Sequence, residues 1–380
     1  MLFGIIILIG ISLLILVHEL GHFIAAKQAG LRVDEFGFGF PPRMFSFKKR
    51  ETTYSFNWIP FGGFVKIYGE RESVENVGGV RSIGNDDLNS SKLARPGERS
   101  DPTSDEGAIE QAERSNIFDT SRSFSHQRAW TRLTIIAAGV AMNFIAGWLL
   151  LSLVFMVGAP QTVVITGVQP ESPARVAGLF EGDQVLEYKT AAEFIAATES
   201  RRGQEFSFHV KRGGEELSII AIPREKKVAG EGAIGVMISE AGFSKLPFFT
   251  ALWEGLKTSI EAMSQILQSF GRLFADVFGH AKITEGVVGP IGIFGVAHQL
   301  GSLGLVYLLQ LIGMISLNLA ILNAIPFPAL DGGRFLFILI EKIKGSKISA
   351  RKELVMNLVG FGLLFILMIA ITARDIIRLF

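Results

Sequence analysis

Two histidines and a glutamate lie within a single helical turn near the start of the chain, in the stretch ILVHELGHFIAAKQAG at residues 15–30. On an α-helix, positions i and i+4 share a face about 6 Å apart, so the side chains of His18 and His22 can bind one metal ion. Glu19 then points toward the open side of that ion and can act as a general base. This H-E-x-x-H spacing is typical of a zinc site that activates water.

The same segment is apolar enough to cross a bilayer, which makes its ionisable side chains costly. A charged group at the bilayer centre costs roughly 2.5–3.5 kcal/mol even on the lenient insertion scale. A bound metal ion would offset that cost. The alternative is that His18 and His22 are neutral and hydrogen-bonded to backbone or to neighbouring helices, with Glu19 protonated or paired. That alternative accounts for the charges but not for their spacing.

A catalytic zinc ion commonly takes three protein ligands, so a third ligand is expected elsewhere in the chain. It must be a histidine or a carboxylate, because the chain contains no cysteine. Asp331 is the best candidate, since it lies among apolar residues after Pro326 and Pro328, which cannot continue a helix. Irregular backbone at membrane depth occurs only where it packs in protein or lines a wet cavity. The open alternative is that the Asp331 carboxylate merely caps the next helix.

These residues together predict hydrolysis of a peptide bond. Zinc lowers the pKa of a bound water to about 7, Glu19 accepts the proton, and the hydroxide attacks a carbonyl polarised by the metal. Glu19 would then return the proton to the leaving amine. The developing oxyanion needs a further donor, for which Asn323 is a candidate; a hydrogen bond between helices is its equally simple alternative role.

The elements that must hold these residues are membrane helices. Of the 380 residues, 49% are apolar and only 19% are charged, and four segments are long and apolar enough to span about 30 Å of hydrocarbon. They lie near 2–25, 133–158, 303–325 and 355–373. The first lacks the basic start of a cleaved signal peptide. A net charge of +1 is too small to attract nucleic acid to the chain as a whole, and no nucleic-acid partner is expected.

The remaining segments have other patterns. Apolar residues alternate over 36–67, which indicates a β-hairpin, whereas 70–122 is polar and reads as a flexible loop. Residues 160–240 mix short strands and helices, and 247–278 have the spacing of an amphipathic helix. We therefore expect a multi-pass α-helical membrane protein with about four transmembrane helices, a membrane-associated β-hairpin and an inserted α+β domain. The expected divisions are 1–69, 70–122, 123–159, 160–240, 241–302 and 303–380.

Basic residues predict the orientation in the membrane. Lys and Arg are retained on the cytoplasmic side, and they gather after the first span, before the second, and between the third and fourth. The active-site side would then face the cytoplasm, while both termini and the α+β domain face outward. Arg374 and Arg378, after the last span, mildly oppose this orientation.

The chain resembles the site-2 protease family of intramembrane zinc metalloproteases, most closely its bacterial RseP-type branch. The resemblance covers nearly the whole length and rests on six motifs. These are HELGH at 18–22, PFGGFVK at 60–66, AAGVAMNF at 137–144, SPARVAGLFEGD at 172–183, GVVGPIGI at 286–293 and NAIPFPALDGG at 323–333. Three features depart from the family pattern: Val140 replaces a proline, the loop 70–122 is long, and only one PDZ-like domain fits.

The resemblance implies that His18, His22 and Asp331 bind Zn²⁺, that Glu19 is the catalytic acid and base, and that Asn323 takes part in substrate handling. It also implies an inner-membrane enzyme whose substrates are single-span membrane proteins, such as an anti-sigma factor or leftover signal peptides, cut after an earlier protease. The inserted domain would be PDZ-like and either capture a C-terminus or exclude bulky substrates. The alternative function is a non-catalytic membrane adaptor, which would have no use for the general base.

Overall fold

The computed structural model describes residues 2–70, 121–226, 232–280 and 288–377. Most of the loop expected at 70–122 therefore lies outside the described residues. The chain divides into two compact units, residues 1–10, 145–318 and 371–380 in the first and residues 11–144 and 319–370 in the second. Each unit is described by itself below.

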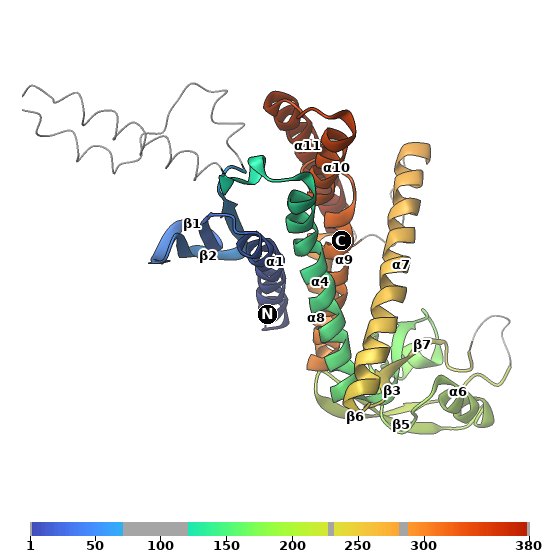
Figure 1. Cartoon of the computed structure of the whole chain (residues 1–380). Helices are drawn as coiled ribbons and strands as arrows, with labels where there is room; N and C mark the ends of the chain where they lie inside the picture. The colour runs from blue at the N-terminus through green and yellow to red at the C-terminus, as the bar shows by residue number, and fades with distance from the viewer. Residues whose placement is uncertain (1, 71–120, 227–231, 281–287, 378–380) are drawn as a thin grey trace, which may run out of the picture. The chain divides into compact units, whose positions relative to one another are not determined.

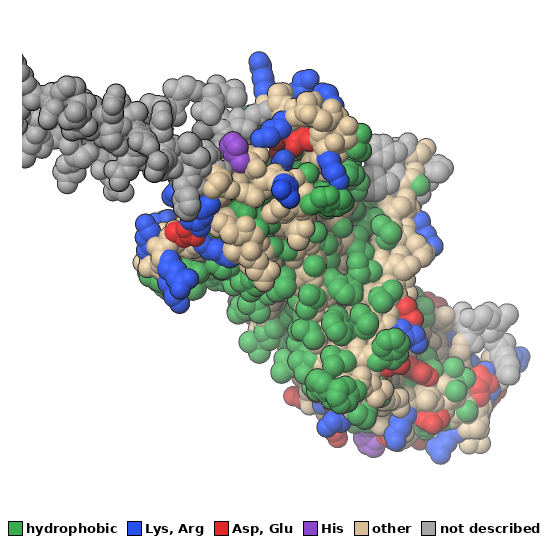
Figure 2. Space-filling model, in the orientation of Figure 1, with side chains coloured by type: hydrophobic (Ala, Val, Ile, Leu, Met, Phe, Trp, Pro, Cys, Tyr) green, Lys and Arg blue, Asp and Glu red, His purple; other side chains and the backbone are tan. Residues whose placement is uncertain are grey.

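Within the described residues, four helices are long and apolar enough to cross a membrane, which agrees with the four spans expected from hydropathy. They are α1 (Leu2–Gln28), α4 (Ala129–Val157), α9 (Leu305–Ala324) and α11 (Ala350–Ile377). Many large apolar side chains on these helices are exposed, and Figure 2 shows apolar side chains gathered over the helices. Such a surface is stable in contact with lipid and not in contact with water.

The expected hairpin is confirmed as β1 (Val33–Lys49) paired antiparallel with β2 (Thr52–Ile67), beside α1 in Figure 1. Both strands bend, because irregularities interrupt the register repeatedly. Residues 35–38 consequently have partners on two sides, in 53–56 and in 63–66. Residues 63–67, at the end of β2, are thereby held along the first half of β1.

The break predicted after the third span is also present. α9 ends at Ala324 and α10 (Asp331–Lys344) begins at Asp331, with the two prolines between them. The bend is tight, since a methyl group on Gly332 or Gly333 would collide with the carbonyl oxygens of Ile325 and Phe327 respectively. These two glycines let the start of α10 fold back on the bend, which fixes where Asp331 lies.

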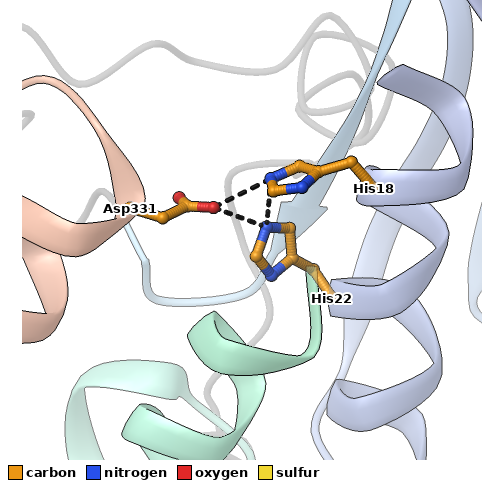
Figure 3. Close-up of side chains that lie close together, drawn as sticks. All are labelled: His18, His22 and Asp331. Carbon is orange, nitrogen blue, oxygen red and sulfur yellow. Dashed lines mark hydrogen bonds and ion pairs between the residues drawn. The ribbon is translucent and has the colours of Figure 1, made fainter. Parts of the chain in front are cut away.

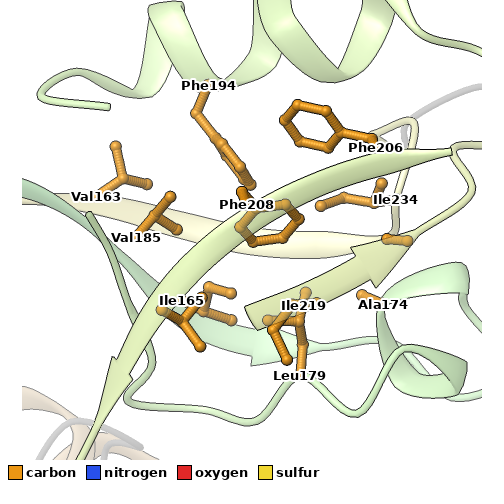
Figure 4. Close-up of a cluster of buried hydrophobic side chains, with 12 residues drawn as sticks. Val163, Ile165, Ala174, Leu179, Val185, Phe194, Phe206, Phe208, Ile219 and Ile234 are labelled. Atoms are coloured by element: carbon orange, nitrogen blue, oxygen red, sulfur yellow. The ribbon is translucent and has the colours of Figure 1, made fainter. Parts of the chain in front are cut away.

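A separate β-domain follows α4. Its antiparallel sheet has the order β6-β5-β4-β3-β7, with the strands β3 (Ala159–Val168), β4 (Gln184–Val185), β5 (Phe206–Arg212), β6 (Glu215–Ala221) and β7 (Val236–Phe243). Two short helices, α5 (Pro173–Val176) and α6 (Ala191–Ser200), accompany the sheet. Alternate residues of β5 point into a buried core in which Phe194, Phe206 and Phe208 pack together (Figure 4). This core gives the domain its own source of stability.

Three further elements complete the described chain. α7 (Phe248–His280) confirms the helix expected at 247–278 and is not among the helices apolar enough to span a membrane. α8 (Pro290–Leu303) has no N-cap side chain of its own, and Asp375 of α11 accepts hydrogen bonds from the Gly289 and Gly292 amides in its place. A 3-10 turn, η1 (Phe124–His126), precedes α4.

Candidate active site

Helix α1 places His18 and His22 on one face, as the i, i+4 spacing predicts. Both imidazoles are buried, with 7% and 8% of their surface exposed. Their Nε2 atoms lie 3.1 Å apart. Two ring nitrogens at this separation point at a common centre.

Asp331 completes the cluster from the first position of α10. Its Oδ2 atom lies 2.8 Å from Nε2 of His18 and 3.1 Å from Nε2 of His22, and Figure 3 shows the three side chains converging. The N-cap of α10 is Leu330, and no side chain caps this helix. The Asp331 carboxylate is thus aimed at the two histidines, which argues against the alternative that it is only a helix cap.

The other nitrogen of each imidazole is occupied by α4. Nδ1 of His22 lies 2.9 Å from the Ile135 carbonyl oxygen, to which it can only donate. Nδ1 of His18 lies 3.2 Å from Nδ2 of the Asn143 amide. If this amide is turned so that its oxygen takes the place of the nitrogen, the oxygen can accept a hydrogen bond from Nδ1. When both Nδ1 atoms carry the proton, both Nε2 atoms keep a lone pair for a metal ion.

Helix α4 approaches the cluster through a glycine. A methyl group on Gly139 would lie 2.5 Å from Nε2 of His22 and 2.8 Å from Cε1 of His18. Gly21 plays the matching part on α1, because a methyl group there would collide with the Ala138 carbonyl oxygen. Glycine at both positions lets the two helix backbones meet next to the imidazoles.

These three side chains have the chemistry of a zinc site. Two imidazole nitrogens and one carboxylate oxygen are ordinary zinc ligands, and at about 2.1 Å from a tetrahedral ion two ligands are about 3.4 Å apart. The observed separations of 2.8–3.1 Å are close to that value. The three ligand atoms could therefore hold one metal ion, which leaves a position for water or substrate.

Glu19 lies beside this cluster and faces a cavity. Its Oε2 atom accepts a hydrogen bond of 3.1 Å from the Val65 backbone amide of β2. The cavity has a volume of about 630 Å³, and Glu19, His22 and Asp331 all line it together with Phe64 and other residues of β2, α4 and α11. The carboxylate therefore reaches the space in which a substrate bond could lie next to the ligand cluster.

Asn323 is not part of the cluster. It lies half-buried at the end of α9, and its side chain makes no hydrogen bond to any residue that the structure describes. It does not line the cavity of Glu19. Its expected role in substrate handling stays a prediction.

Sequence reasoning passed over Asn143 and Gly139. Both lie in AAGVAMNF, a motif on which the family resemblance rested, and neither was given a role. A signal was available: Asn143 is a polar residue in a spanning helix four positions after a glycine. A polar group in that setting is expected to have a partner.

Comparison with known proteins identifies the family of this chain. The family described as peptidase family M50 matches residues 6–367. The zinc metalloprotease RasP of Oceanobacillus iheyensis is 32% identical, covering 97% of each chain. The regulator of sigma-W protease RasP of Bacillus subtilis is 31% identical over 97% of this chain and 96% of its own. The chain therefore belongs to peptidase family M50, the site-2-type zinc metalloproteases, as its motifs predicted.

Proposed function

We propose that this chain is an intramembrane zinc endopeptidase that cuts single-span membrane proteins within or near their transmembrane segments. The observation that carries the proposal is the convergence of His18, His22 and Asp331 from two helices, with Glu19 beside them on a cavity. An arrangement of this kind inside apolar helices is costly unless it serves a metal ion. A non-catalytic adaptor gains nothing from it.

The chain's own residues divide the chemistry among them. His18, His22 and Asp331 would hold the zinc ion, which when bound polarises the scissile carbonyl and acidifies the attacking water. Glu19 takes a proton from that water and delivers it to the amine nitrogen of the leaving strand. The Val65 amide positions the Glu19 carboxylate through its hydrogen bond. Asn143 orients the His18 ring as an outer-shell partner.

The outer edge of residues 63–67 is suited to hold the substrate. The Val65 amide donates to Glu19 and so points away from β1, which pairs on the opposite side. An extended peptide that adds to this edge by backbone hydrogen bonds would pass next to the catalytic carboxylate. Such pairing would also keep a substrate helix unwound, which exposes the amide to be cut.

The substrate class and the orientation follow from the sequence and the relatives. The printed name of the Bacillus subtilis relative ties that protein to regulation of sigma-W, and we infer an anti-sigma factor as a substrate of this chain. We further propose that the β-domain is PDZ-like and acts as a size filter or captures a C-terminus, and that it faces away from the cytoplasm, in line with the distribution of basic residues.

The decisive test is the substitution Glu19→Gln. The amide keeps the shape of the carboxylate but cannot accept a proton, so cleavage of a single-span test substrate should fall by about 10²–10⁴-fold. Zinc content should stay at the wild-type level, because Glu19 is not among the three ligands. The matched control is Glu261→Gln on the exposed face of α7, which should cut normally. Equal cleavage by Glu19→Gln and wild type would refute the mechanism.

A further inference from the structure

Another cavity, of about 560 Å³, lies where α1 ends and the hairpin turns. Four basic side chains line it: Lys27, Lys49, Arg50 and Arg122. Glu51 is its only acidic lining residue. The described lining is therefore strongly cationic, and it is separate from the cavity of Glu19.

The single carboxylate is already neutralised. Glu51 Oε1 lies 2.6 Å from Lys27 Nζ and 2.7 Å from Arg122 Nη2. Hydrogen bonds from Arg122 and Lys27 lower the pKa of Glu51 to about 2. Lys49 and Arg50 form no ion pair with any residue that the structure describes. Two cations thus remain over one side of the cavity with no counter-charge in the described chain.

The cavity lies at the end of a helix that is apolar enough to cross a membrane. Lys27 belongs to the last turn of α1, a helix apolar enough to span the bilayer. The aromatic rings of Phe23 and Tyr54 meet edge to face at 6.1 Å in the same lining, and Phe47 stacks on Tyr54. Aromatic rings and basic side chains are enriched together at the depth of lipid headgroups.

We propose that this cavity binds a phosphate group, supplied at a membrane face by the headgroup of an anionic phospholipid. Arginine offers a planar pair of donors that fits phosphate oxygens, and lysine adds a compact positive charge. The apolar floor formed by Phe23 and Tyr54 suits the glycerol and upper acyl region of a lipid. Free phosphate offers the same oxygen atoms to the basic side chains, but it has no apolar part to contact Phe23 and Tyr54.

A ligand in this cavity would stabilise the position of the hairpin against α1. Its lining comes from the end of α1, from the turn between β1 and β2, and from Arg122. A ligand bound there bridges the helix that carries HELGH and the strands that carry Val65. Occupancy therefore stabilises the contact between hairpin and helix, without taking part in catalysis.

The test uses the purified full chain in neutral detergent, with wild type and two double variants. Lys49→Gln/Arg50→Asn removes the two cations without a described counter-charge, and asparagine tolerates the positive φ of 57° at residue 50. Lys344→Gln/Arg351→Gln removes the same charge from exposed positions outside the cavity. Short-chain phosphatidylglycerol, phosphatidylcholine and inorganic phosphate are titrated separately, and binding is read by native mass spectrometry and thermal shift.

Wild type should bind phosphatidylglycerol in preference to phosphatidylcholine, and Lys49→Gln/Arg50→Asn should weaken that binding about tenfold. The control double variant should bind like wild type. Inorganic phosphate that binds as tightly as phosphatidylglycerol would assign the site to the free ion instead of the lipid. The proposal is overturned if wild type shows no preference for either phosphate ligand over phosphatidylcholine, or if both double variants lose affinity equally.

Discussion

Two aspartates, the half-buried Asp331 at the start of α10 and the buried Asp183 in the β-domain, are held in opposite ways. Asp183 is fully buried and saturated by donors, because Arg212 Nε and Nη2 lie 2.7 and 2.6 Å from its oxygens and the Phe180 amide donates at 2.9 Å. Among the described residues, the Asp331 carboxylate is hydrogen-bonded to the Nε2 atoms of two histidines, each of which has its Nδ1 atom against α4.

The difference separates a structural charge from a functional one. The positive charge that neutralises Asp183 is part of the chain, so the pair is complete when the domain folds. The groups around Asp331 are imidazole nitrogens, and when both Nδ1 atoms carry the proton, both Nε2 atoms keep lone pairs that, with the carboxylate, suit a cation from outside the chain. A carboxylate grouped with two imidazole nitrogens is therefore a candidate metal ligand, whereas one paired with an arginine is not.

The substitution Asp331→Asn should have the largest effect of the four variants that test this comparison. The amide is a weak zinc ligand, so we expect zinc no longer to co-purify with the variant and cleavage to be lost, a larger effect than the 10- to 100-fold of an outer-shell change. Metal analysis of the purified chain measures its zinc content, and cleavage of a single-span substrate measures its activity. Wild-type zinc content in this variant would remove Asp331 from the ligand set.

Asp183→Asn should have the converse effect. It breaks the pair with Arg212, and the expected cost is about 2–3 kcal/mol, below the 3–5 of a fully buried pair because water still reaches the arginine. Arg212 has 34% of its side chain exposed. Hydrogen exchange of the β5 amides should accelerate about 30- to 150-fold, while zinc content stays at the wild-type level. Loss of zinc here would contradict the separation of the two roles.

The substitution Asn143→Ala tests whether the partner of a predicted zinc ligand contributes to zinc affinity. Without the amide, His18 loses its Nδ1 partner, and zinc affinity should fall about 10- to 100-fold in a chelator competition. Asn318→Ala, at an exposed position of α9, is the matched control and should bind zinc like wild type. Unchanged affinity in Asn143→Ala would mean that the His18 ring is oriented by packing alone.

Glu51 extends the comparison to a half-exposed carboxylate, with the smallest expected effect. Its pKa is lowered from 4.5 to about 2, so its stabilising contribution is complete above pH 4.5 and is lost as the pH falls toward 2. Glu51→Gln should lower stability by about 1 kcal/mol or less at neutral pH. Melting curves of variant and wild type should converge near pH 2, and a constant gap down to that pH would contradict the assignment.

The sequence predicted the main elements, and it predicted the three residues that the structure brings together; that they bind a metal ion stays a prediction. Hydropathy located the spanning helices, alternation located the hairpin, and helical periodicity placed His18 and His22 on one face. Asp331 could be paired with them because prolines marked the only plausible break in an apolar helix, and the structure has that break. These are local signals, which a single sequence carries.

The rest depends on how helices are rotated against one another. α4 is apolar over nearly its whole surface, so its sequence has no polar stripe to tell which side meets α1. The contacts of Gly139 and Asn143 with the imidazoles were therefore not predicted. The role of Asn323 stays a prediction for a related reason, since its position one residue before the end of α9 does not fix where its side chain points.

The glycine beside the imidazoles also decides from which direction a peptide can arrive. Because the backbone of α4 at Gly139 leaves no room for even a methyl group against both rings, that side of the ligand cluster is a closed wall. The open side is the one with Glu19 and the Val65 edge. A substrate peptide is therefore expected to reach the ligand cluster from the side of Glu19 and Val65.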